Sequence, residues 1–85
     1  MATVSPSNTP NPNAMKFTLD TKLPAAMNFA SADAARGNAF AEAVFATDGV
    51  VQVFGVNDFV TVTRRPGADW GPIVEAVKAA AAEHL

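Results

Sequence analysis

The stretch VVQVFGVNDFVTVT, which runs from Val50 to Thr63, decides the fold of this chain. Its two halves, Val50–Phe54 and Phe59–Thr63, are rich in β-branched and aromatic residues, which favour strands. Gly55 and Asn57 lie between the halves and supply the conformational freedom that a turn needs. Apolar residues stand on both faces of the second half, which indicates either a central place in a sheet or one packed face with the other partly covered. The stretch therefore predicts a β-hairpin within a sheet.

The strongest helical pattern follows this hairpin. Its apolar residues recur at helical spacing over about four turns: Trp70, Ile73, Val74, Val77, Ala81 and Leu85. Asp69 is placed to cap the first turn, and Pro72 is tolerated there because that turn has no internal N–H bonds to lose. A shorter helix is predicted before the hairpin, where Phe40 and Val44 share one face and Asn38 can act as the cap.

The other predicted elements are shorter. The segment AMKFTLD, residues 14–20, alternates apolar and polar residues, which predicts a half-buried strand. MNFA, residues 27–30, is a candidate short strand. An edge strand over Ala2–Ser5 is expected to stop before Pro6, which cannot donate a hydrogen bond to a sheet.

One or two helical turns are expected between Ser31, as their cap, and Gly37, which would close them. Together these elements predict an α+β fold, a small, mostly antiparallel sheet with two amphipathic helices on one face. A length of 85 residues allows a single domain, residues 1–85.

Composition excludes several classes of function. The formal net charge is −2, and among the six Lys and Arg residues only Arg64 and Arg65 are adjacent, so nucleic-acid binding is not expected. No apolar run approaches the roughly 20 residues of a membrane span, and the N-terminus lacks the pattern of a signal peptide, so we expect a cytoplasmic protein. The absence of cysteine excludes disulfides, thiolate nucleophiles and cysteine-ligated iron–sulfur or zinc sites.

The polar residues do not predict a catalytic centre. His84, the single histidine, lies at the end of the last helix, where a cation interacts favourably with the helix C-terminus. The carboxylates fall at expected caps, turns and solvated faces, and no pair of them is marked as a general acid and base. Arg64 and Arg65 are interpreted as a solvated strand end, with an acidic partner as the alternative. Trp70 is interpreted as a core residue, with an interface anchor as the alternative.

The segment TPNPN, from Thr9 to Asn13, is stiff and polar. Pro10 and Pro12 each fix their own backbone and hold the preceding residue, Thr9 or Asn11, in extended geometry. Asn13 is suited to turning the chain into the next strand. These properties predict a preorganised connector, and the exposed asparagines leave a recognition loop as the alternative.

Three segments in this order and spacing carry a resemblance to a known family: TPNPNAMKF (Thr9–Phe17), DGVVQVFGVNDFVTVTR (Asp48–Arg64) and ADW (Ala68–Trp70). They look like the N-terminal domain of the Nfu/NifU-type iron–sulfur cluster scaffold proteins. In longer members a separate C-terminal domain carries a CxxC pair that holds the cluster. A chain without cysteine resembles the members that consist of the N-terminal domain alone, and cluster ligation does not transfer to it.

The resemblance implies a non-catalytic accessory domain in iron–sulfur cluster assembly or delivery. We expect a protein-interaction module, a monomer without a cofactor of its own, whose partners are iron–sulfur carrier or recipient proteins. The alternative is a metal-handling domain, of the iron or heavy-metal-associated type, that uses oxygen ligands. The residues carried over from the family signature, as possible partner contacts, are Thr9, Pro10, Asn11, Pro12, Asn13, Asp58, Phe59, Asp69 and Trp70.

Overall fold

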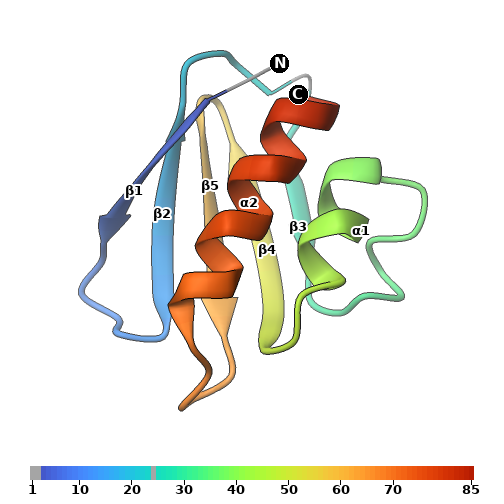
Figure 1. The fold of residues 1–85 in the computed structure, drawn as a ribbon. Helices are drawn as coiled ribbons and strands as arrows, with labels where there is room; N and C mark the ends of the chain where they lie inside the picture. The colour runs from blue at the N-terminus through green and yellow to red at the C-terminus, as the bar shows by residue number, and fades with distance from the viewer. Residues whose placement is uncertain (1–2, 24) are drawn as a thin grey trace.

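The computed structural model describes residues 3–23 and 25–85, which form one antiparallel sheet with two helices packed on one of its faces (Figure 1). The sheet order is β1-β2-β5-β4-β3. The elements are β1 (Val4–Asn8), β2 (Ala14–Leu19), β3 (Met27–Phe29), α1 (Ala39–Phe45), β4 (Val50–Val56), β5 (Phe59–Arg64) and α2 (Trp70–His84). The predicted α+β class is confirmed. We call the face that the helices cover the helical face and the other the open face.

The predicted hairpin is formed by β4 and β5, and β5 is the central strand of the sheet. Its turn is shorter than the sequence indicated. Gly55 belongs to β4, and Val56 pairs with Phe59, so Asn57 and Asp58 alone make the turn. Asn57 adopts a φ of 55°, a left-handed conformation that asparagine tolerates better than most residues.

Gly55 is required by close packing rather than by the turn. A Cβ atom at this position would lie 2.8 Å from Leu23 Cδ1 and 2.9 Å from Met27 Cγ. The absence of a side chain at Gly55 therefore makes room for Leu23 and Met27, which pack against β4. Backbone bonds hold the same region: Leu19 N donates to Asp58 O and Leu23 N donates to Asn57 O, both at 2.6 Å.

The core lies between the helical face and the two helices. Phe17, Val53, Val60 and Val62 of the sheet are fully buried and point toward this layer. Burial of each such side chain contributes roughly 1.5–3 kcal/mol. The helices contribute buried apolar residues, of which only Ala80 lies outside the predicted faces: Phe40, Ala41 and Val44 from α1, and Ile73, Val77, Ala80 and Ala81 from α2. Asn38 and Asp69 cap the two helices, as predicted.

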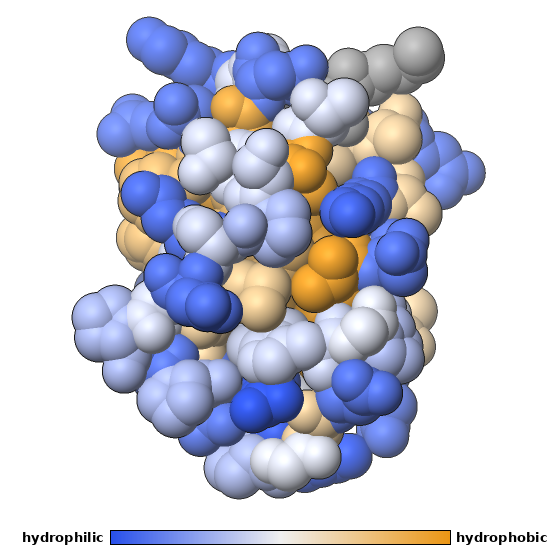
Figure 2. Space-filling view, turned by 60° about the vertical axis from the view of Figure 1, so that its left-hand side comes forward, coloured by the Kyte–Doolittle hydropathy of each residue, from blue (hydrophilic) through white to orange (hydrophobic). Residues whose placement is uncertain are grey.

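The strand β1 differs from the prediction, because it continues through Pro6 to Asn8; Ala2 lies outside the described residues. Asp20 N donates to Thr3 O, and Thr3 N donates to the Asp20 side chain, so Ser5 and Ser7, at two-residue intervals from Thr3, also face β2 with their backbone N–H and C=O groups. Pro6 falls on the alternate parity, where an N–H would point away from the sheet. An edge strand loses no internal bond at such a position. Figure 2 shows apolar groups in the seam between β1 and α2, with hydrophilic groups on either side.

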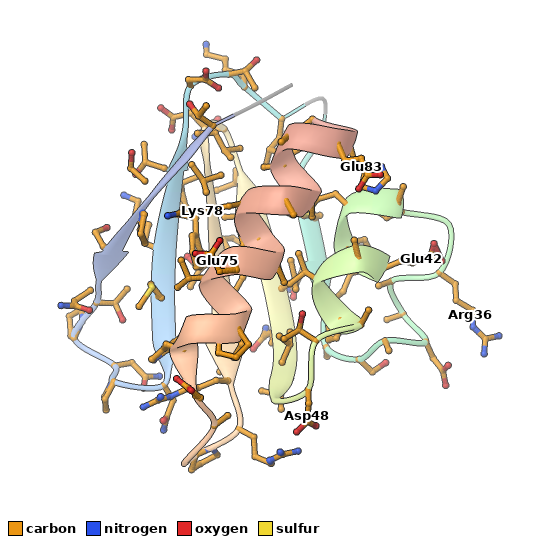
Figure 3. All side chains as sticks on the ribbon, viewed as in Figure 1. Arg36, Glu42, Asp48, Glu75, Lys78 and Glu83 are labelled. Carbon is orange, nitrogen blue, oxygen red and sulfur yellow. The ribbon has the colours of Figure 1, made fainter. Side chains whose placement is uncertain are left out.

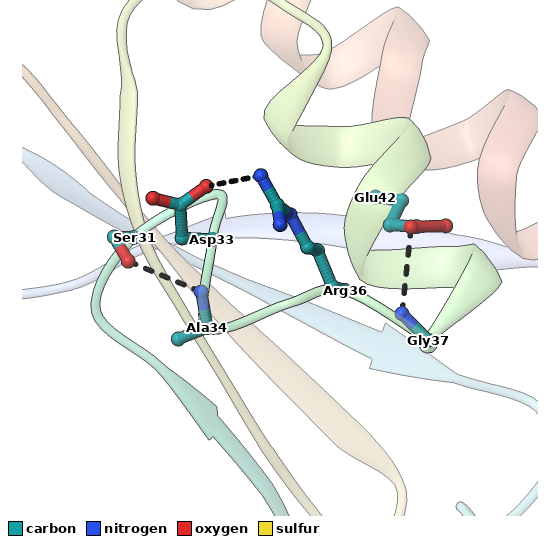
Figure 4. A network of polar contacts seen from close by, with 6 residues as sticks. All are labelled: Ser31, Asp33, Ala34, Arg36, Gly37 and Glu42. Carbon is teal, nitrogen blue, oxygen red and sulfur yellow. Dashed lines mark hydrogen bonds and ion pairs between the residues drawn. The ribbon is translucent and has the colours of Figure 1, made fainter.

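The turns predicted after Ser31 are present but do not extend into a regular helix, with Ala35 N donating to Ser31 O and Arg36 N to Asp33 O, both at 3.3 Å. Residues 32–37 are a series of turns, and Gly37 ends them with a φ of 91°. Ser31 does cap them, since its Oγ accepts a bond from Ala34 N at 3.2 Å (Figure 4). An exposed ion pair between Arg36 and Asp33 and the Gly37 N–H bond to Glu42 complete the segment. Residues 32–37 read ADAARG and contain no large apolar side chain, so the segment has little apolar face to bury and forms no amphipathic helix.

Candidate functional site

A pocket of about 330 Å³ opens at the end of the sheet where the β1–β2 loop meets the start of α2. These elements lie together at the bottom of Figure 1. The pocket is lined by Asn8, Thr9, Pro10, Asn11, Pro12, Ala14, Met15, Arg64 and Trp70. We call it the TPNPN pocket. Strand pairing explains its position, because β2 follows the loop directly and lies beside β5, whose last residue is Arg64.

Side-chain bonds within the loop fix one wall of the pocket. Thr9 Oγ1 lies 2.9 Å from the carbonyl oxygens of Asn11 and Ala14 and accepts a bond from Asn11 N at 3.2 Å. Asn11 Oδ1 accepts a bond from Asn13 N at 2.9 Å. The chain is therefore turned by the Asn11 side chain, whereas the sequence had indicated Asn13 for that role. With two prolines and these bonds, the loop is preorganised.

Arg64 connects the loop to the start of α2. Its Nε–H donates to Asn13 Oδ1 at 3.4 Å, and its Nη1 donates to Ala68 O at 2.5 Å. The guanidinium carbon lies 5.1 Å from the centroid of the Trp70 ring, a cation–π contact. The Trp70 indole N–H in turn donates to Pro12 O at 3.4 Å. These contacts hold a flat aromatic ring and a planar cation side by side in the wall of the pocket.

The structure brings most of the predicted signature residues together. Thr9, Pro10, Asn11, Pro12 and Trp70 all line the pocket. Asn13 and Asp69, which are adjacent in sequence to Pro12 and Trp70, support the pocket without lining it. Asn13 holds the Arg64 side chain, and Asp69 caps α2 by accepting a bond from Gly71 N at 3.0 Å.

Asp58 and Phe59 lie elsewhere, at the opposite end of the β4–β5 hairpin. Asp58 belongs to the turn, and its carbonyl oxygen accepts the bond from Leu19 N. Phe59 lies on the open face, where the Lys16 ammonium stands 4.6 Å from its ring centroid. The signature is thus divided between two ends of the molecule.

Four residues line the pocket although they were not among the candidate site residues: Asn8, Ala14, Met15 and Arg64. Arg64 was interpreted as a solvated strand end, but it is partly buried and forms contacts with three segments. One sign was visible in the sequence, because Arg64 comes directly after the predicted strand Phe59–Thr63. Without the pairing of β2 with β5, nothing indicated that the TPNPN loop lies beside that strand end.

Acidic side chains do not converge at the pocket or elsewhere in the described part of the chain. Figure 3 shows Glu42, Asp48, Glu75 and Glu83 spread over the helical layer and its loops. Within residues 3–23 and 25–85, no three His, Cys, Asp or Glu side chains are close enough together to hold a metal ion. The described residues therefore offer no cluster of three carboxylates to a metal ion. Nor is any described helix long and apolar enough to cross a bilayer.

The family model described as the scaffold protein Nfu/NifU N-terminal domain matches residues 4–85. The chain belongs to this family. Among curated proteins, NifU-like protein 5, mitochondrial, of Arabidopsis thaliana is 38% identical over 72 residues, which are 79% of this chain and 25% of that protein. The NFU1 iron-sulfur cluster scaffold homolog, mitochondrial, of Drosophila ananassae is 33% identical over 73 residues, 82% of this chain and 26% of that protein.

The Nfu/NifU N-terminal chain spans about a quarter of the length of these two relatives. Among solved structures, the crystal structure of protein SAV1430 from Staphylococcus aureus superposes with a TM-score of 0.77 at 30% sequence identity. The superposition covers 92% of this chain and 96% of that one. The resemblance inferred from the three sequence segments is confirmed. The cytoplasmic location stays a prediction, since both curated relatives are named as mitochondrial proteins.

Proposed function

We propose that this Nfu/NifU N-terminal domain is a non-catalytic interaction module in iron–sulfur cluster assembly or delivery. It docks cluster carriers or recipient apoproteins through the TPNPN pocket and ligates no cluster itself. Family membership supports the role in cluster assembly, because the family is one of scaffold proteins and not of catalysts. A chain without cysteine lacks the thiolates that hold clusters, so recognition is the contribution that remains to it.

The single observation that carries the proposal is the convergence of two signature segments on one pocket. Pro12 and Trp70 are joined by a hydrogen bond across 58 positions of sequence. If the TPNPN segment only connected β1 to β2, it would not need to form a pocket or to contact Trp70. Tryptophan and arginine are also the residues that most often dominate protein–protein binding energy.

The rigidity of the pocket wall also supports docking. Two prolines, the Thr9 and Asn11 side-chain bonds and the Arg64 contacts hold the wall in place before a partner arrives. A preorganised surface loses less conformational entropy on binding, so a small site of this kind can still contribute useful affinity.

A titration of the isotope-labelled domain with an iron–sulfur carrier and with a recipient apoprotein tests the proposal. We expect weak binding that is reported by backbone amide shifts and that weakens as salt is raised, because Arg64 is charged. Each partner is added once at low salt and once at physiological salt. A set of carriers and recipients that leaves every amide unperturbed would contradict the proposed function.

A further inference from the structure

The charge of the TPNPN pocket is unbalanced. Of the nine residues that line it, only Arg64 is charged. The ion pairs of the described residues involve Arg36, Arg65 and His84, and Arg64 takes part in none of them. Asp69, the carboxylate next to Trp70 in sequence, is turned to the Gly71 N–H. Among the described residues, no carboxylate therefore forms an ion pair with the cation in the wall.

The Arg64 guanidinium has more N–H groups than the two that are hydrogen-bonded within the described residues. A guanidinium carries five N–H groups, and two of them bond to Asn13 Oδ1 and Ala68 O. These two bonds and the Trp70 ring fix the plane of the group. An arginine that is fixed in this way recognises carboxylates well, because its planar fork matches their two oxygens.

The other lining residues expose polar and apolar groups in similar measure, and the apolar part can contact an apolar side chain. Pro10, Pro12, Ala14, Met15 and the Trp70 ring present carbon surface. The volume of about 330 Å³ corresponds to on the order of ten water molecules. That is room for one large side chain with a neighbouring carboxylate, and too little for a helix.

An added strand does not fit this end of the sheet. Asn8 is the last residue of β1, and Pro6, two residues earlier on the same outward parity, offers no N–H to a pairing chain. A partner that enters here is therefore anchored by side chains and by Arg64, rather than by a ladder of backbone bonds.

We infer that the TPNPN pocket binds a short protein segment in which a large apolar side chain stands beside a carboxylate. The apolar side chain lies against Met15, Trp70 and the prolines, and the carboxylate accepts bonds from Arg64. The inference rests on the proposed function, since it names the part of the partner protein that the site recognises. The carboxylate is that of an aspartate or glutamate side chain or of a chain end.

Matched peptides test the inference with the intact domain. The probe is acetyl-Ser-Phe-Asp-Ser-amide, and its controls are the same peptide with Asn for Asp and the same peptide with Ala for Phe. A fourth peptide, acetyl-Ser-Ser-Phe with a free C-terminus, tells a chain end from a side chain as the source of the carboxylate. Binding is followed by the Trp70 indole and Arg64 Nε–H resonances and by tryptophan fluorescence, to which Trp70 is the sole contributor.

We expect the Asp peptide to bind roughly fivefold or more tightly than the Asn peptide, because a charged acceptor strengthens the bonds to Arg64. Replacement of Phe by Ala should weaken binding roughly tenfold. The variant Arg64→Gln should remove the preference for Asp. The matched control Arg65→Gln should retain it, since Arg65 does not line the pocket and pairs with the exposed Asp48.

Equal binding of the Asp and Asn peptides to the wild-type domain would overturn the inference. So would a preference for Asp that is lost equally in both arginine variants. Should Arg64→Gln fail to fold, the wild-type comparison still decides, because the Asp peptide must shift Arg64 Nε–H more than the Asn peptide does. Absence of peptide discrimination, with a carrier protein still binding at the pocket, would defeat this inference alone and leave the proposed function standing.

Discussion

The two ends of the β4–β5 hairpin use the family signature in different ways. At the turn end, Asp58 and Phe59 take part in tight backbone bonding, and Gly55 has no room for even one more carbon atom. At the other end, Trp70 and the TPNPN loop surround a pocket whose wall contains Arg64, which forms no ion pair among the described residues. The turn end is filled by closely packed side chains, whereas the other end contains a pocket whose walls are fixed by hydrogen bonds and prolines.

This difference separates residues that keep the fold from residues that are available for binding. Changes at the turn end should lower the free energy of unfolding and leave the binding of a carrier unaffected. Changes in the pocket should weaken binding with a smaller effect on stability. Each prediction below tests one side of this division.

The largest expected effect is the loss of stability from Gly55→Ala. The new Cβ would stand within 3 Å of Leu23 and Met27, and overpacking of this kind costs about 1–3 kcal/mol. The matched control is Gly71→Ala beside the pocket, whose Cβ would come no closer than 3.5 Å to Asp69 Oδ1. In a helix that change should be neutral or stabilising by up to about 1 kcal/mol. Urea unfolding of both variants is the measurement, and equal midpoints would remove the distinction between the two ends.

Trp70→Ala should weaken the binding of an iron–sulfur carrier by roughly tenfold, about 1.4 kcal/mol, as expected for a central aromatic contact. The matched control is Phe54→Ala on the open face. Phe54 is more exposed than Trp70, with 38% of its surface accessible, yet it lies outside the pocket. Titration calorimetry on variants that are first shown to be folded decides the point. A greater loss of affinity in Phe54→Ala would place the docking surface on the open face instead.

A smaller effect is expected at the hairpin turn. Asn57 holds a φ of 55°, and alanine tolerates this conformation less well than asparagine, so Asn57→Ala should lower stability by about 1 kcal/mol. Asn57→Gly should be neutral or slightly stabilising for the same reason. Carrier binding should be unchanged in both variants. A turn variant that keeps its stability but loses binding would show that this end also contacts the partner.

The smallest effect concerns pH. The backbone N–H of Thr3 donates to Asp20 Oδ1 at 3.0 Å and lowers the pKa of Asp20 below its usual value of 3.8. Because the pKa in the folded state lies below that in the unfolded state, this contribution to stability is present above pH 4 and fades as pH falls through the folded-state pKa. Asp20→Asn should flatten that part of the acid-unfolding profile. An unchanged profile would show that the bond to Thr3 has no measurable effect.

The elements that the sequence predicted well are those whose signals are local. The stripe of α2, the Asn38 and Asp69 caps and the alternation of β2 each lie within a few residues, so their positions could be read directly. β1 was predicted as an edge strand but too short, because Pro6 was expected to end it, whereas its position points away from β2. That orientation depends on strand pairing, which no local pattern contains.

The pocket depends entirely on contacts between distant residues. Trp70 was interpreted as core because its spacing fits the stripe of α2, and the ring is in fact only half-buried. Its bond to Pro12 and its contact with Arg64 follow from the antiparallel pairing of β2 with β5. The family resemblance marked both segments but did not show that they meet.

The central claim is that partners dock at the TPNPN pocket. Cross-saturation transferred from an unlabelled iron–sulfur carrier to the deuterated, isotope-labelled domain tests it most directly, because this effect marks amides at the contact itself. We predict loss of signal at the non-proline amides of residues 8–15, at Arg64 and at Trp70, with the Asn57–Asp58 turn and Phe54 unaffected. Loss of signal concentrated at the turn or on the open face, with the pocket amides unchanged, would contradict the claim.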